Sequence, residues 1–318
     1  MRYIIGLDIG GTKCAVTVGS AEGSNVKVLK KQGFATCEVK SAEEFFERIF
    51  EIIDSFKAEF NFDAIGISCG GPLDETKGVI ICPPHLPLLH GVEISKVLTD
   101  RYSIPAYLRN DANACALAEW LFGAGVGTKN MAFLTFGTGL GAGLILDGKL
   151  YSGTNGNAGE VGHIRLSPFG PSGYGKTGSF EGFCSGKGIA QLGYTLGLEA
   201  VQNGITPQYF ENGITAEISA KDIAIAADNG DKTAIEVYAT CGRYLGLGLS
   251  VLIDILNPER IVIGSIYQRS ENLLVEYVNE SIKKEALGVS AECCEIVPAK
   301  LGNDIGNIAA LSVAVYGQ

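Results

Sequence analysis

Basic residues are scarce in this sequence. The 318 residues include 25 lysines and arginines against 35 aspartates and glutamates, which gives a formal net charge of -10 at pH 7. Proteins that hold nucleic acid neutralise its phosphates with lysine and arginine, and this chain has the opposite balance. We therefore expect no nucleic-acid partner.

Paired metal-binding cysteines and long apolar runs are also missing. None of the nine cysteines has another at the two-residue gap of a zinc knuckle, which favours reduced, buried thiols. The chain passes from Met1 into a strand pattern at Tyr3 without an apolar leader, and we expect no later segment to be apolar over the length of a bilayer. These absences predict a cytoplasmic protein with no membrane partner.

Two segments repeat one pattern, in which a glycine-rich turn separates two apolar runs. The first surrounds Gly10 and Gly11, and the second surrounds residues 137–141. The recurrence predicts a duplicated architecture, and a chain of this length with 46% hydrophobic residues can build two cores.

The spacing of apolar residues predicts the remaining elements. Helices are expected over 42–60, 93–102, 112–122, 221–229, 232–256, 271–285 and 304–316, and strands over 26–35, 64–69, 106–109, 260–263 and 294–297. Residues 151–188 are rich in Gly, Ser and Pro, which is typical of a functional loop region.

The first glycine turn has the residues of a phosphate site. Gly10 and Gly11 let backbone amides face an anion, while Thr12 adds a hydroxyl and Lys13 a positive charge. Asp8, just before the turn, would help to hold magnesium through water. The alternative is a tight hairpin whose glycines only satisfy the turn geometry.

The second turn offers Gly137, Thr138 and Gly139 as phosphate contacts. A dinucleotide-binding motif is excluded by its context, because these glycines lie between two strands and do not open a helix. We expect both turns to bind one polyphosphate.

The two turns, together with three further motifs, resemble the ROK family of sugar kinases and repressors, within the actin, Hsp70 and hexokinase fold class. The further motifs are Asn110-Asp111-Ala112-Asn113-Ala114, Gly159-Glu160-Val161-Gly162-His163 and Asn257-Pro258-Glu259-Arg260-Ile261-Val262-Ile263-Gly264. They follow the order of the family, and the resemblance covers nearly the whole chain.

The resemblance implies an α/β protein with a two-domain actin-like ATPase (ribonuclease H-like) fold, in which duplicated mixed-sheet domains surround a cleft. The small domain would comprise residues 1–112 plus about 303–318, and the large domain residues 113–302. The resemblance also implies a homodimer.

The activity implied by the resemblance is that of an ATP-dependent sugar kinase that uses Mg-ATP to phosphorylate the 6-hydroxyl of a hexose. Asp111 would be the general base that takes the proton of the attacking hydroxyl, and a helix N-cap is its alternative role. Gly264 would lie on the adenosine side. The implied sugar contacts are Gly70, Gly71, His85, Asn110, Asp111, Glu160, His163 and Glu181.

Part of the glycine-rich region departs from the family pattern. Most members have three zinc-binding cysteines where this chain has Ser172, Tyr174 and Ser179, and hydroxyls replace thiolates poorly, so we expect no structural zinc.

Residues 170–177 match the sequence pattern of a phosphate-binding P-loop. A P-loop needs a helix after it, and the glycines at 178–188 are expected to discourage one.

Three functions remain open: a sugar kinase, a sugar-binding transcriptional regulator lacking its DNA-binding module, and a P-loop nucleotidase that depends on Lys176. Regulators of the family carry their DNA-binding module ahead of the first phosphate turn, where this chain begins a strand at Tyr3.

The sugar could be glucose, fructose, allose, an N-acetylhexosamine or a β-glucoside, because His85 stands where many relatives have asparagine. Ser265 and Ile266 interrupt the family's adenosine-side glycine run, which leaves the tightness of nucleotide binding open.

Overall fold

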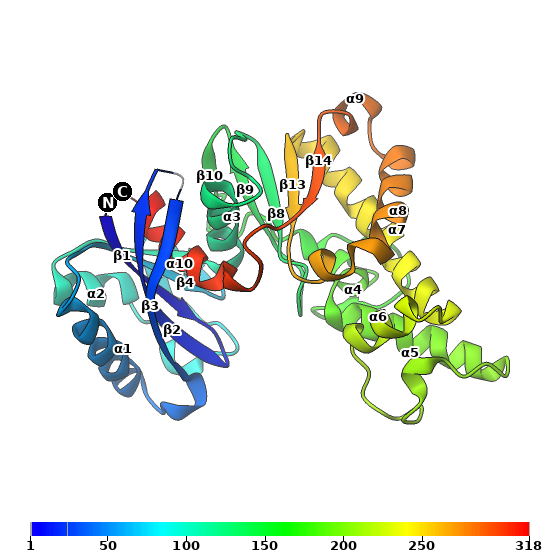
Figure 1. Ribbon diagram of the computed structural model, residues 1–318, viewed down its shortest axis with the longest axis horizontal. Coiled ribbons are helices and arrows are strands. Elements are labelled where there is room, and N and C mark those ends of the chain that lie inside the picture. The colour runs from blue at the N-terminus through cyan, green and yellow to red at the C-terminus, as the bar shows by residue number, and fades with distance from the viewer. Residues whose placement is uncertain (1, 24, 318) are drawn as a thin grey trace. The chain divides into compact units, whose positions relative to one another are not determined.

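The computed structural model describes residues 2–23 and 25–317, and the chain forms two compact units (Figure 1). The first unit comprises residues 1–129, 143–158 and 300–318, and the second comprises 130–142 and 159–299.

The first unit contains a mixed sheet with the strand order β3-β2-β1-β4-β7. Its strands are β1 (Arg2–Ile9), β2 (Lys13–Glu22), β3 (Asn25–Ala35), β4 (Phe62–Cys69) and β7 (Ala106–Asn110). β2 is antiparallel to β1 and β3, whereas β4 is parallel to β1 and β7. The short strands β5 (Leu73–Asp74) and β6 (Val79–Ile80) form a separate hairpin.

Four longer helices pack in the first unit. They are α1 (Ala42–Lys57), α2 (Ile94–Tyr102), α3 (Asp111–Phe122) and α10 (Ile305–Tyr316). Phe45 and Ile49 of α1 join Leu7 and other strand residues in the main hydrophobic core, as the helical spacing predicted. α10 lies close to β1 and β4. A Cβ on Gly66 would lie 2.1 Å from the carbonyl oxygen of Ala310, so only glycine permits this approach.

A second sheet has the strand order β10-β9-β8-β13-β14. Its strands are β8 (Met131–Leu134), β9 (Ala142–Leu146), β10 (Lys149–Tyr151), β13 (Arg260–Ile263) and β14 (Glu295–Pro298). β13 is parallel to β8 and β14, and β9 and β10 form an antiparallel hairpin. The expected α/β fold with two mixed sheets is confirmed.

The second unit contains most of the helices. They are α4 (Phe180–Phe183), α5 (Gly186–Gln202), α6 (Ala220–Asp228), α7 (Lys232–Leu256), α8 (Ile266–Glu285) and α9 (Gly288–Ala291). Short 3₁₀ turns in the two units are η1 (Thr36–Glu38), η2 (Pro87–Leu89), η3 (Val161–His163), η4 (Gln208–Phe210) and η5 (Gly302–Asp304). The pattern of apolar residues predicted α7 and β13 at their observed bounds.

Two expectations about these helices are wrong. The glycines at 178–188 do not prevent a helix, because α5 begins at Gly186 with Ser185 as its N-cap. α7 is long and apolar enough, by length and composition alone, to cross a membrane. Its buried face packs against α8, α6 and α5, which is also the behaviour of a core helix in a soluble protein.

Candidate active site

The first glycine turn joins β1 and β2. The backbone N–H of Gly10 donates to the carbonyl of Lys13 at 3.0 Å, and the hydroxyl of Thr36 donates to the carbonyl of Gly10 at 2.7 Å. A Cβ on Gly11 would lie 2.6 Å from the Cβ of His85. His85, which the resemblance assigned to the sugar, therefore lies directly against the predicted phosphate turn.

Asp8 lies near the end of β1, just before this turn. Burial raises its pKa to about 6, and the negative charge of Asp111 adds to the rise, while Lys31 and Lys13 oppose it. A bound cation would relieve both the burial cost and the repulsion, and carboxylate oxygen is a ligand that Mg²⁺ prefers. Within residues 2–23 and 25–317, no three His, Cys, Asp or Glu residues are grouped to hold a metal. Water and phosphate oxygens would have to complete the coordination of a magnesium ion at Asp8.

Asn110 and Asp111 lie where β7 ends and α3 begins. Asn110 is the N-cap of α3, and its Oδ1 accepts a hydrogen bond from the N–H of Ala112 at 2.9 Å. Asp111 is the first helical residue and is exposed, although its Oδ1 lies 2.8 Å from the same N–H. The capping role that could have explained Asp111 is thus filled by Asn110.

Gly70 and Gly71, the two glycines expected to contact the sugar, differ in their surroundings. A Cβ on Gly71 would lie 3.2 Å from Nδ2 of Asn110, so the Gly71 backbone lies beside that amide. A Cβ on Gly70 would meet no atom within 4 Å. Asn110 and Gly71 form one small polar surface near Asp111.

The second glycine turn is braced by a carboxylate. The N–H of Gly141 donates to the hydroxyl of Thr135 at 2.9 Å, and the N–H of Leu140 donates to Oε2 of Glu181 at 3.1 Å. A Cβ on Gly139 would lie 2.8 Å from the same oxygen. Glu181, expected to contact the sugar, therefore also supports the predicted phosphate turn.

Glu160 and His163 lie at either end of the 3₁₀ turn η3. Nε2 of His163 is 4.0 Å from Oε2 of Glu160, and about half of each side chain is exposed. A Cβ on Gly162 would lie 3.2 Å from the Cβ of Glu181. The structure thus brings together Glu160, His163 and Glu181 within the second unit.

Residues 172–177 form a β-hairpin. Its strands are β11 (Ser172–Gly173) and β12 (Lys176–Thr177), and Tyr174 and Gly175 at its tip have positive φ angles of 47° and 74°. Nζ of Lys176 donates to the carbonyl of His163 at 2.7 Å. A P-loop runs from a strand through a loop into a helix, so the match to the P-loop expression is not accompanied by its conformation.

The positions that hold zinc in most family members make other contacts here. The ring of Tyr174 packs edge-on against His163, with the ring centroids 5.0 Å apart. The hydroxyl of Ser179 caps α4 by accepting from the N–H of Gly182 at 3.0 Å. The hairpin is therefore joined to His163 by packing and hydrogen bonds.

A pocket of about 820 Å³ opens beside the second turn. Gly137 and Thr138 form one side, and Lys187, Ser265 and Arg269 contribute from α5 and the start of α8. Its volume falls within the usual range for small-molecule sites, and its three cationic side chains outnumber its two carboxylates, which suits a phosphorylated ligand. All its lining residues belong to the second unit, and its size, charge and glycine turn fit a nucleotide.

Sequence reasoning missed the part that Ser265 plays in this pocket. Gly264, the predicted contact, is buried, and its N–H donates to the carbonyl of Leu134 at 3.0 Å. Ser265 follows it with φ 57° and ψ -106°, a backbone conformation that favours glycine. Its hydroxyl accepts a hydrogen bond from Nη2 of Arg269 at 3.2 Å. α8 begins at Ile266, five residues earlier than its periodicity predicted.

Known proteins with similar sequences include glucokinases and transcriptional regulators. The sequence model of the ROK family matches residues 4–315. The glucokinase of Halalkalibacterium halodurans is 32% identical, with 96% of this chain and 93% of that protein aligned. The glucokinase of Streptomyces coelicolor is 29% identical over 99% of this chain and 98% of its own length.

Solved structures with the same fold include both kinases and a regulator. A ROK hexokinase from Thermus thermophilus has a TM-score of 0.81 at 27% identity, covering 99% of both chains. A ROK glucokinase from Streptomyces griseus, solved with glucose and AMPPNP, has a TM-score of 0.76 at 29% identity, covering 98% of this chain and 99% of that one. A ROK transcriptional regulator homologous to the Escherichia coli MLC protein has a TM-score of 0.84 at 25% identity, covering 99% of this chain and 78% of that one.

Proposed function

Because the chain belongs to the ROK family, we propose that it is an ATP-dependent kinase that phosphorylates the 6-hydroxyl of a hexose. The observation that carries the proposal is the exposed Asp111, at the start of α3, whose charge acts on the buried carboxylate of Asp8. A candidate base and a candidate magnesium ligand thus interact electrostatically within one unit. Glucokinases that align over nearly the whole chain support the same activity.

In the first unit, Asp111 would accept the proton of the attacking sugar hydroxyl, a role that contributes roughly 10²- to 10⁴-fold in rate. Asn110 and Gly71 would orient the sugar from the adjoining surface. Asp8 would hold magnesium through water, beside the cationic Lys13. When bound with ATP, magnesium neutralises charge on the phosphates.

In the second unit, the pocket beside Gly137 and Thr138 would bind the nucleotide. Glu160 would accept hydrogen bonds from sugar hydroxyls, and His163 could donate or accept, since a sugar needs many directed hydrogen bonds. Glu181 would also accept from a sugar hydroxyl while bracing the second turn through Leu140. The proposal therefore gives this carboxylate a positioning task besides its sugar contact.

ATP consumption by the purified protein, measured against hexoses, N-acetylhexosamines and β-glucosides, tests the proposal. We expect turnover with one sugar and a fall of roughly 10²- to 10⁴-fold in kcat for Asp111→Asn. Nucleotide affinity, measured by calorimetry, should stay within a few-fold, because the pocket residues lie in the second unit. Lys176→Ala is the control, since its side chain bonds only a backbone carbonyl. It should keep most of the turnover.

Turnover that survives Asp111→Asn within a few-fold would rule out this base. Turnover lost only in Lys176→Ala would instead favour a P-loop nucleotidase. Binding of a sugar without any ATP consumption would favour a sugar-binding regulator, the second candidate, which the TM-score of 0.84 to a ROK regulator supports. We extend the proposal to a cytoplasmic homodimer, which sedimentation of the active protein would test.

A further inference from the structure

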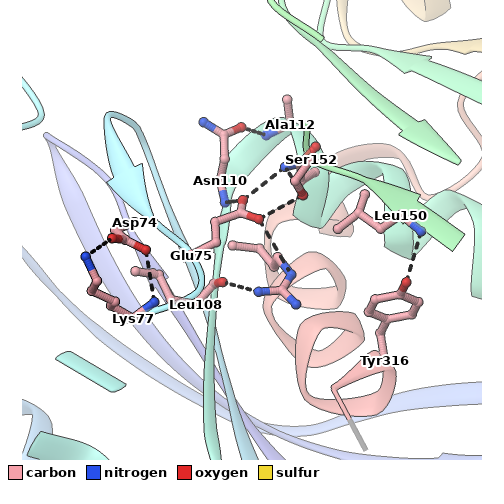
Figure 2. Close-up of polar contacts among 11 residues, drawn as sticks. Asp74, Glu75, Lys77, Leu108, Asn110, Ala112, Leu150, Ser152 and Tyr316 are labelled. Carbon is pink, nitrogen blue, oxygen red and sulfur yellow. Dashed lines mark hydrogen bonds and ion pairs between the residues drawn. The ribbon is translucent and has the colours of Figure 1, made fainter. Parts of the chain in front are cut away.

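Glu75 lies at the centre of a hydrogen-bond network in the first unit. Only 7% of its side chain is exposed. Oε1 accepts from the N–H of Asn110 at 2.8 Å and from Nδ2 of Asn113 at 3.0 Å, and Oε2 accepts from the hydroxyl of Ser152 at 2.9 Å. Figure 2 shows the carboxylate between Asn110 and Ser152. Nε of Arg109 lies 3.8 Å from Oε2, which adds a positive charge.

The carboxylate joins two segments that are distant from it in the sequence. One is the junction of β7 and α3, which contains Asn110 and Asn113, and the other is Ser152, which follows β10. Burying a carboxylate costs several kcal/mol unless hydrogen bonds and an opposite charge compensate for it, and Glu75 has both. Removing it would leave the buried donors of Asn110 and Asn113 without this partner.

Glu75 contacts residues on both sides of the predicted base, Asp111, along the chain. Asn110 immediately precedes Asp111, and Asn113 follows two residues later. Asn110 is held at its N–H by Glu75, and its own Oδ1 holds the N–H of Ala112. Glu75 thereby holds the backbone before Asp111 directly and the side chain of Asn113 after it, without requiring contact with a substrate.

We propose that Glu75 is a positioning residue that sets the backbone, and so the carboxylate, of Asp111 for proton transfer. The inference rests on the proposed kinase function. A displacement of about 1 Å in a catalytic group can cost on the order of 10²-fold in rate, so loss of this anchor should affect kcat more than binding.

Steady-state kinetics of Glu75→Ala and Glu75→Gln test the proposal. We expect Glu75→Ala to lower kcat by about 10- to 100-fold while KM for ATP changes by less than about 3-fold. Glutamine keeps one oxygen that can accept from Asn110 and Asn113. Glu75→Gln should therefore recover most of kcat, to within about 5-fold of the parent.

Glu119 supplies the matched control. It is a fully buried carboxylate on α3, the helix that begins at Asp111. It accepts hydrogen bonds from the N–H groups of Ala124, Lys300 and Leu301. Glu119→Ala should lower the thermal midpoint at least as much as Glu75→Ala, yet keep kcat within about 2-fold of the parent. Equal losses of kcat in the two alanine variants would overturn the proposal, because they would reflect general destabilisation.

Amide hydrogen exchange provides a readout that does not depend on turnover. In Glu75→Ala, exchange at Asn110 and Ala112 should rise at least about 10-fold, in Glu75→Gln it should rise less because one accepting oxygen remains, and Glu119→Ala should leave it unchanged. If no sugar supports ATP consumption, the kinase proposal fails, and the exchange data still decide whether Glu75 orders this segment. Unchanged exchange in both Glu75 variants would overturn the positioning role.

Discussion

The buried carboxylate of Asp8 lowers the stability of the folded chain when it is ionised. Burial and the charge of Asp111 raise its pKa from 3.8 to about 6. Between these pH values the folded chain binds more protons at this site than the unfolded chain does. The contribution of Asp8 to the free energy of unfolding therefore falls as pH rises through this window, and above about pH 6 the ionised group is a net cost.

Asp8→Asn should remove that cost. In the absence of magnesium and nucleotide, we expect the variant to exceed the parent's free energy of unfolding by less than about 1 kcal/mol near pH 4 and by about 3 kcal/mol at pH 7.5. Urea unfolding at the two pH values measures the difference. Magnesium with ADP should stabilise the parent more than the variant, because only the parent has the proposed magnesium ligand. A variant that is less stable than the parent at pH 7.5 would contradict the burial cost.

The sequence predicted the local positions of candidate site residues. Asp8, Gly10 and Asp111 lie at the expected strand ends and turn, and their roles remain proposals. Ser265 and Glu75 could not be found in this way. The importance of Ser265 comes from a glycine-like backbone conformation, and that of Glu75 from partners up to 77 residues away in the chain.

At the scale of elements, α5 shows why glycine content misled the prediction. Gly188, Gly193 and Gly197 all lie on its buried face. A Cβ on Gly188 would lie 2.0 Å from the carbonyl oxygen of Gly182 and 3.0 Å from that of Glu181. The glycines are required for close packing, and this tertiary gain outweighs their weak helix propensity. Apolar positions at Ile189 and Leu192, together with Ser185 as a cap, were the available signals for a helix.

Gly188→Ala tests this explanation. Alanine is the better helix former by about 1 kcal/mol, yet we expect the variant to lose about 2 to 4 kcal/mol of stability, because its Cβ would strike backbone atoms. Denaturant unfolding measures the loss. Gly288→Ala, at the start of α9, is the control, since its Cβ would meet no atom within 4 Å. A neutral or stabilising Gly188→Ala would show that propensity dominates in α5.

At the scale of the whole molecule, the duplicated pattern of the sequence corresponds to two mixed sheets. β8 and β9 were recognised as a second strand pair because their apolar runs are continuous, and α7 because its periodicity extends over 25 residues. The sequence could not show that α7 combines the length of a membrane span with a buried face. Packing against α8 depends on residues that lie far along the chain, including close approaches at Gly242 and Gly246.

The net charge and the packing of α7 together predict how the chain behaves towards large anionic partners. With a net charge of -10, the protein should be repelled by both phosphatidylserine vesicles and duplex DNA. We expect no co-flotation with vesicles and no retention of DNA on a filter at about 150 mM salt. Flotation with neutral vesicles separates the two causes, because insertion of α7 would not need charge attraction. Binding to neutral vesicles would show that α7 leaves its packed position, whereas DNA retention would show a local basic surface and strengthen the regulator hypothesis.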